Sequence, residues 1–225
     1  MEFPGVAPAK ITIFGGIETT ETFLVAVCVT IGITVFALVV RFALLPRFKQ
    51  VPTGFQNVLE ILVSLIDRFT NSILGEHGKK IAAYIFTLGM FLVISGMLDL
   101  IGLRIPATDL NFTVAIALIT FVLVFVFGIR YRGVKGVVKG YAQPMAFIAP
   151  FRIISDLIIP VSLSFRLFGN MFAGLVVMHI VYNAMGVFAV GIPAALSVYF
   201  TLFDVGIQTF VFLMLTLSYI REKME

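Results

Sequence analysis

The sequence is dominated by long apolar runs that contain no charged residue. The longest run, Leu167–Phe203, extends over 37 residues between Arg166 and Asp204. About 20 apolar residues are enough to cross the hydrocarbon core of a bilayer, so runs of this length predict helices within a membrane. Charged residues make up only 12% of the chain, whereas a soluble domain needs roughly 25%. We therefore expect an all-α membrane protein.

The apolar runs predict about five membrane-embedded helices and one further helix at the membrane surface. All of them fit one domain of 225 residues, and no internal repeat is apparent. The domain divides into an external N-terminal segment (1–19), a first span (20–45), an amphipathic helix (54–78), two further spans (81–103 and 109–130) and a final hairpin (145–221).

The segment between the first two spans has a different pattern. Its apolar residues recur at helical spacing and its polar residues fill the remaining positions, which is typical of an amphipathic helix at a membrane surface. A helix in a soluble loop is the alternative. The apolar set is Val58, Ile61, Leu62, Leu65, Ile66 and Phe69, and the polar set is Glu60, Asp67, Arg68 and Asn71.

The final hairpin is too long to stand upright in a bilayer. As helices, 151–185 and 193–219 would be about 52 Å and about 40 Å long, against a hydrocarbon core of about 30 Å. Such a mismatch predicts steep tilt. We expect Asn183, Gly186, Gly191 and Pro193 to supply the turn between the two arms. Pro160 is a position at which the first arm can bend or break.

The basic residues predict which side of the membrane each loop occupies. With five crossings, the basic clusters at 41–49 and 79–80, at 130–139 and at 221–223 all fall on one side. The positive-inside rule makes that side cytoplasmic, so the N-terminus is expected outside and the C-terminus inside a bacterial plasma membrane. The net charge of +4 therefore indicates topology, and no nucleic-acid partner is expected.

Arg166 is the residue that most strongly suggests a function. A charge at mid-membrane is costly, and an arginine cannot lose its proton to escape the cost, so it needs an anionic or polar partner. Helical spacing places Ser162 and Asn170 on the same face as Arg166, and Asp204 and Gln208 form a second polar face on the other arm. Two alternatives stay open: Arg166 pairs within the chain with Asp204 or Asp156, and the amides of Asn170 and Gln208 only link the helices.

The remaining polar residues carry weaker signals. We expect Arg152 and Asp156, four residues apart, to pair near a helix end. Asp99 fits an interfacial end of a helix, and His179 alone is more typical of packing than of ion transfer. One cysteine, Cys28, and two distant histidines, His77 and His179, predict no metal site.

The segment Pro160–Gly174, with its Arg-Leu-Phe-Gly-Asn core, resembles the signature of subunit a of the F-type ATP synthase. The segments Ile207–Tyr219 and Leu103–Thr113 also resemble parts of that family, and the resemblance covers roughly residues 20–221. It implies a non-catalytic stator subunit without a cofactor. Its implied partners are the c-ring of proteolipid subunits, the subunit b peripheral stalk, the rest of the synthase and membrane lipid.

The resemblance also implies a mechanism. In the family, two offset half-channels lead H+ or Na+ to a ring of carboxylates, and an arginine at the position of Arg166 faces the passing carboxylate. Asn170 and Gln208 match supporting positions, and Ser162 lies beside them. Two common channel positions carry Leu175 and Thr201 here, so His179 and Asp204, about one helical turn away, are expected to replace that pair. Asp156 is the candidate for the cytoplasmic half-channel, and Ile159 stands where some relatives carry Lys.

Two other classes of function are alternatives to this interpretation. A stand-alone ion channel or secondary transporter would use Arg166 to bind an anion, although no repeated half supports a transporter fold. An intramembrane enzyme is less well supported, because no motif of a membrane protease or hydrolase is present.

Overall fold

The computed structural model describes residues 10–13, 17–49, 54–142, 147, 149–185 and 191–224. This part of the chain is almost entirely helical, which confirms the prediction of an all-α membrane protein. Five of the described helical segments are long and apolar enough to cross a membrane. They are Glu21–Arg47, Ala82–Ile101, Leu110–Val137, Ala149–Met185 and Ala194–Met224.

The chain enters its first helix from a short β-hairpin, which the sequence did not predict. Strands β1 (Lys10–Ile13) and β2 (Ile17–Thr20) pair antiparallel, and α1 (Glu21–Val39) follows directly. The helix then widens into the π-helical turn η1 (Val40–Leu44) and ends in the 3₁₀ turn η2 (Leu45–Arg47).

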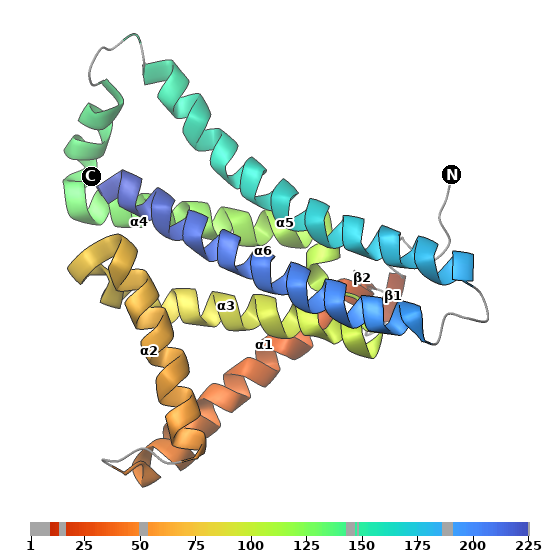
Figure 1. Cartoon of the computed structure of the whole chain (residues 1–225). Coiled ribbons are helices and arrows are strands. Elements are labelled where there is room, and N and C mark those ends of the chain that lie inside the picture. The colour runs from red at the N-terminus through yellow and green to blue at the C-terminus, as the bar shows by residue number, and fades with distance from the viewer. Residues whose placement is uncertain are drawn as a thin grey trace.

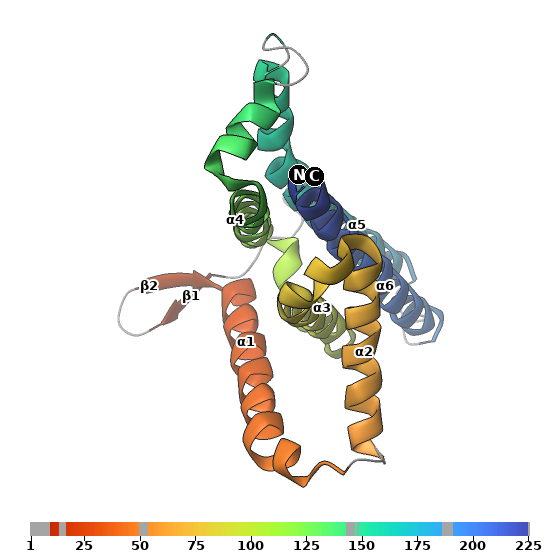
Figure 2. The same ribbon diagram turned by 90° about the vertical axis from the view of Figure 1, so that its left-hand side faces the viewer.

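The amphipathic segment forms α2 (Phe55–Leu74), which is followed by the 3₁₀ turns of η3 (Gly75–Lys80). In Figure 2, α1 and α2 extend away from the remaining helices and run roughly side by side with a wide gap between them. Much of the apolar face of α2, including Val58, Ile61 and Leu65, is not covered by the chain. This exposed apolar face fits a helix that rests on lipid.

The centre of the molecule is built by α3, α4, α5 and α6. Helix α3 (Ala82–Met97) leads through the short turns η4 (Leu98–Ile101) and η5 (Pro106–Thr108) into α4 (Leu110–Ala142). Helix α4 is kinked at Gly133, whose φ of 72° favours glycine. Helices α5 (Ala149–Met185) and α6 (Ile192–Met224) follow as a long antiparallel pair across α3 and α4 (Figure 1).

The hairpin has the length that the sequence predicted. Helix α5 contains 37 residues and is therefore about 55 Å long. The helix continues through Pro160 without a break. Of the predicted turn residues, Gly186 lies outside the described residues and Gly191 directly precedes α6. The prediction is wrong for Asn183 and Pro193, because α5 continues to Met185 and α6 begins at Ile192.

One buried stripe of α5 forms much of the core. It points towards α4 and α6, and its members recur every three or four residues, as expected for a helix that packs on one side. The opposite side of α5 is left uncovered. The buried stripe comprises Asp156, Ile159, Leu163, Ser164, Leu167 and Met171.

Candidate functional site: an exposed arginine between two polar clusters

Arg166 lies near the middle of α5 on the side that the chain leaves exposed. Large apolar side chains close to it in the sequence of α5, including Val161 and Phe165, are exposed as well. Among the described residues, none forms a hydrogen bond or ion pair with its guanidinium group. The alternative that Arg166 pairs with Asp204 or Asp156 is therefore not what the structure shows.

Asn170 and Gln208 link the two arms of the hairpin one turn beyond Arg166. The Asn170 Nδ2 atom donates to Gln208 Oε1 at 2.5 Å. Gln208 is only 1% exposed, and its Nε2 atom has no hydrogen-bond partner within the described part of the chain. Ser162 is half-buried one turn before Arg166, on the same side of α5. The two predicted polar faces thus meet at Asn170 and Gln208.

A cavity of about 410 Å³ lies between α5 and α6, from Asn170 towards the joined end of the hairpin. Two carboxyl groups, those of Asp99 and Asp204, line it. Asp204 faces Gly174 across the hairpin, since a Cβ atom added at Gly174 would lie 3.6 Å from the Asp204 Oδ2 atom. The remaining wall is mostly apolar, so these acids are the groups in the cavity that can carry a charge.

Asp99 is a site residue that the sequence interpretation placed only at a helix end. Its Oδ2 atom accepts a hydrogen bond of 3.0 Å from the Thr201 hydroxyl, and this contact joins η4 to α6. The signal in the sequence was a carboxylate at the end of an apolar run, but nothing in the sequence shows that α6 lies beside it. His179 is not among the cavity-lining residues; it follows Met178, the lining residue nearest the end of α5.

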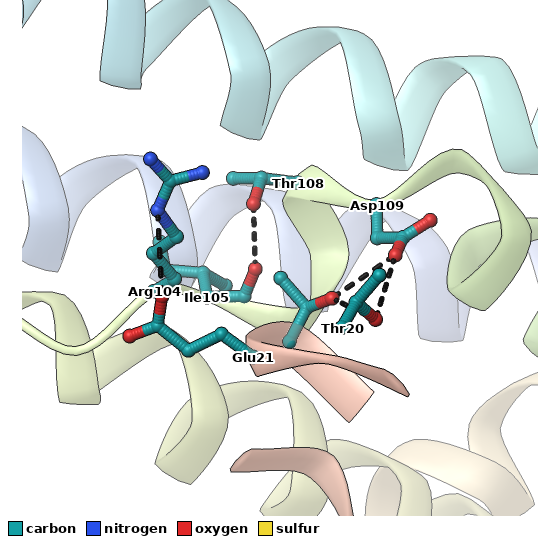
Figure 3. A network of polar contacts seen from close by, with 7 residues as sticks. Thr20, Glu21, Arg104, Ile105, Thr108 and Asp109 are labelled. Carbon is teal, nitrogen blue, oxygen red and sulfur yellow. Dashed lines mark hydrogen bonds and ion pairs between the residues drawn. The ribbon is translucent and has the colours of Figure 1, made fainter. Parts of the chain in front are cut away.

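The wall of the cavity is held by a polar network at the same end of the bundle (Figure 3). Asp109 accepts hydrogen bonds from the hydroxyls of Thr22, at 3.0 Å, and Thr20, at 3.5 Å. Arg104 Nε lies 3.9 Å from Glu21 Oε2, which adds an ion pair to the network. These contacts tie the start of α1 to the loop that carries the lining residue Ile105.

A second polar cluster lies at the opposite end of the bundle, around Asp156. Lys223 Nζ lies 2.5 Å from the Asp156 Oδ2 atom, and the Tyr141 hydroxyl donates to the same oxygen. The expected pair of Arg152 and Asp156 is wrong, because Arg152 donates to the Gly140 carbonyl oxygen instead. The carboxylate is buried on the inner stripe of α5, where α4 and α6 supply its partners.

Tyr141 is a hydrogen-bond donor to this carboxylate. Burial, the hydrogen bond to Asp156 and the negative charge of Asp156 all raise the pKa of Tyr141 above its ordinary value. The phenol therefore keeps its proton at physiological pH. Together, the two clusters place carboxylates on either side of Arg166 along the hairpin, an arrangement suited to ions that approach an exposed arginine from both sides.

Comparisons with known proteins identify the family. A family model described as ATP synthase A chain matches residues 22–221. The chain is 36% identical over 191 residues to "ATP synthase subunit a, sodium ion specific" of Propionigenium modestum, a match covering 78% of this chain and 65% of that protein. It is 33% identical to "ATP synthase subunit a 3" of Pelobacter propionicus, covering 93% and 91% of the two chains. For "ATP synthase subunit a" of Geobacter sulfurreducens the identity is 33%, covering 97% and 92%.

The family match spans all five membrane-length helices, including the hairpin that carries Arg166. The relatives are bacterial and are each named as a subunit of ATP synthase, so the rest of that complex is the assembly to which such a chain contributes. On these grounds, the chain is a multi-pass membrane protein that belongs to the ATP synthase subunit a family.

Proposed function

We propose that this chain is the ion-translocating stator subunit of an F-type ATP synthase, in which Arg166 faces the carboxylates of a c-ring. The observation that carries the proposal is the position of Arg166: mid-helix, exposed, and without an ion pair to any described residue. A guanidinium group in a membrane needs a counter-charge. The exposed apolar side chains of α5 leave this face open to another protein, which can supply the counter-charge.

The fixed positive charge of Arg166 has two effects in this mechanism. Charge pairing in a low-dielectric environment favours the ionised form of a passing carboxylate, which helps the ring to release its ion. The same charge repels a cation that attempts to cross directly between the half-channels. Ion flow is thereby coupled to rotation of the ring, while the chain itself carries out no catalytic step.

The cavity between α5 and α6 is the proposed outer half-channel. Asp204 and Asp99 provide carboxylates along it, and Asn170 and Gln208 lie at its inner end, next to Arg166. We place His179 at the entrance, beyond the last lining residue of α5. In this arrangement Asp204 takes the place of the acidic or histidine residue that many relatives carry at the position of Thr201.

Asp156 belongs to the proposed cytoplasmic half-channel, because it lies towards the end of the bundle that carries the basic loops. With five spans, the N-terminus outside and the C-terminus inside, this end of the bundle faces the cytoplasm. Ser162 lies between Asp156 and Arg166 along α5. The proposed partners are the c-ring along the exposed side of the hairpin and the subunit b peripheral stalk, and the translocated ion is H+ or Na+.

Substitution of Arg166 tests this function. Arg166→Ala is expected to abolish coupled ATP synthesis, because no charge then meets the ring carboxylate, while the complex still assembles. Arg166→Lys is expected to fail as well, because the compact ammonium group lacks the planar fork of the guanidinium group. ATP synthesis in membrane vesicles, with subunit content measured in the same vesicles, is the readout.

Arg130→Ala is the matched control, since Arg130 is also exposed but lies on α4, outside the hairpin. It should retain synthesis. Normal synthesis in the Arg166→Ala variant would overturn the proposal. Ion transport by the purified chain alone in proteoliposomes would instead favour the stand-alone channel or transporter.

A further inference from the structure

We propose that Lys223 is a positioning residue that restrains ion passage at Asp156, so that the end of α6 acts as a gate on the cytoplasmic half-channel. This inference rests on the proposed function. It starts from the buried cluster of Asp156, Lys223 and Tyr141, in which the three side chains come from α5, α6 and α4. Lys223 lies near the end of α6, and Figure 1 shows this end beside α4.

Two hydrogen bonds in this cluster converge on one carboxylate oxygen, and a third contact joins their donors. Lys223 Nζ and the Tyr141 hydroxyl both donate to the Asp156 Oδ2 atom, and Lys223 also lies 3.4 Å from the Tyr141 hydroxyl oxygen. The ammonium group stands over two aromatic rings, 4.9 Å from the centroid of Tyr141 and 5.4 Å from that of Phe125. Such contacts hold a cation by the negative face of the ring.

The cluster is largely removed from solvent. The side chains of Lys223 and Asp156 are only 15% and 10% exposed. If Asp156 took up a proton, the negative charge opposite Lys223 would vanish, and a buried ammonium group would be left without a counter-charge. Breaking a buried pair in this way is strongly unfavourable. Lys223 therefore occupies the Asp156 carboxylate for as long as it stays in place, and an ion reaches that carboxylate only when Lys223 moves off.

The other basic groups nearby do not replace Lys223. Arg152, on the same helix as Asp156, donates to the Gly140 carbonyl oxygen. The guanidinium group of Arg132 also lies near Gly140, since a Cβ atom added there would be 3.5 Å from both of its terminal nitrogens. Within the described part of the chain, Lys223 is thus the cation that contacts the Asp156 carboxylate.

The gate follows from this geometry. For Asp156 to pass a proton on, the ammonium group of Lys223 must move off with its own three protons, the carboxylate must accept the incoming proton, and that proton must leave before Lys223 returns. No proton is gained or lost by Lys223 in this cycle. Removing the ammonium charge should therefore speed passage through Asp156, whereas removing the carboxylate should slow it.

Passive ion conductance of the assembled complex tests the gate. Vesicles carrying the complex, with its soluble catalytic part stripped off, are given a potassium diffusion potential, and H+ and Na+ uptake are followed with ion-sensitive dyes. A carbodiimide that modifies the ring carboxylates defines the specific conductance. We expect Lys223→Gln to raise this conductance several-fold and Asp156→Asn to lower it several-fold. Lys135→Gln, at an exposed site of α4 just beyond the kink at Gly133, should leave it unchanged.

The double variant Asp156→Asn with Lys223→Gln separates a gate from a structural clamp. If Lys223 acts through Asp156, the gain from Lys223→Gln should disappear in the double variant. A gain that persists without Asp156, or a loss in both single variants, would overturn the gate. Absence of carbodiimide-sensitive conductance in the unsubstituted complex would instead count against the proposed function itself.

Discussion

At the scale of single residues, the carboxylates of Asp99 and Asp156 bind side chains of other helices rather than of their own. Asp99 contacts Thr201 on α6, and Asp156 contacts Lys223, also on α6. The sequence predicted a neighbour on the same helix for Asp156, because spacing reveals only residues that share a helix face. It did indicate that Asn170 lies opposite Gln208, because both belong to one antiparallel hairpin.

Asp99 provides a test of the cavity at this scale. We expect Asp99→Asn to slow ATP-driven ion pumping several-fold with assembly retained, because one of the two carboxylates of the cavity is lost. Thr201→Val should have a milder effect and cost about 0.5 to 1.5 kcal/mol of stability, because the half-buried Asp99 carboxylate loses one hydrogen-bond donor. Pumping is measured by ion uptake into inverted vesicles.

Asp67→Asn, at a half-buried carboxylate on α2 outside the cavity, is the control for this substitution and should pump normally. Equal pumping by Asp99→Asn and the unsubstituted complex would show that the cavity does not carry the ions.

At the scale of helices, the contact between α3 and α6 depends on a glycine. A Cβ atom added at Gly96 would lie 2.5 Å and 2.7 Å from the two Cγ atoms of Val205. Helices in membranes approach closely where small residues meet. This contact holds α6 against α3 in the region where η4 presents Asp99 to Thr201, so it also supports the cavity.

We expect Gly96→Ala to destabilise the helix bundle by about 1 to 3 kcal/mol, the usual cost of overpacking. Thermal unfolding of the detergent-solubilised complex measures the effect. Val205→Ala in the same chain should recover part of the loss, because it removes both Cγ atoms. Gly32→Ala on α1, where a Cβ atom would meet nothing within 4 Å, is the control. A Gly96→Ala variant as stable as this control would contradict the close contact.

At the scale of the whole molecule, bilayer thickness made the helices predictable from the sequence. Charge-free runs between basic loops define where spans begin and end, so the helices and the overlong hairpin could be expected. The packing of the helices could not, because apolar residues surround each span and no periodic face shows which neighbour it meets. The hydrogen bond from Thr22 to Asp109, which joins residues 87 positions apart, could not be predicted from the sequence for the same reason.

The number of spans also fixes the sides of the membrane on which the loops lie. An odd number of crossings puts the β-hairpin and the part of α4 beyond its kink at Gly133 on opposite sides. The basic residues of that part of α4 predict that it lies in the cytoplasm. After Cys28→Ser, we expect a cysteine introduced by Thr19→Cys to react with a membrane-impermeant thiol reagent on intact cells. A cysteine introduced by Lys135→Cys should react only after permeabilisation. Labelling in the reverse order would mean that the molecule has the opposite orientation in the membrane. The Asp156 cluster, rather than the cavity of Asp99 and Asp204, would then lie at the outer surface.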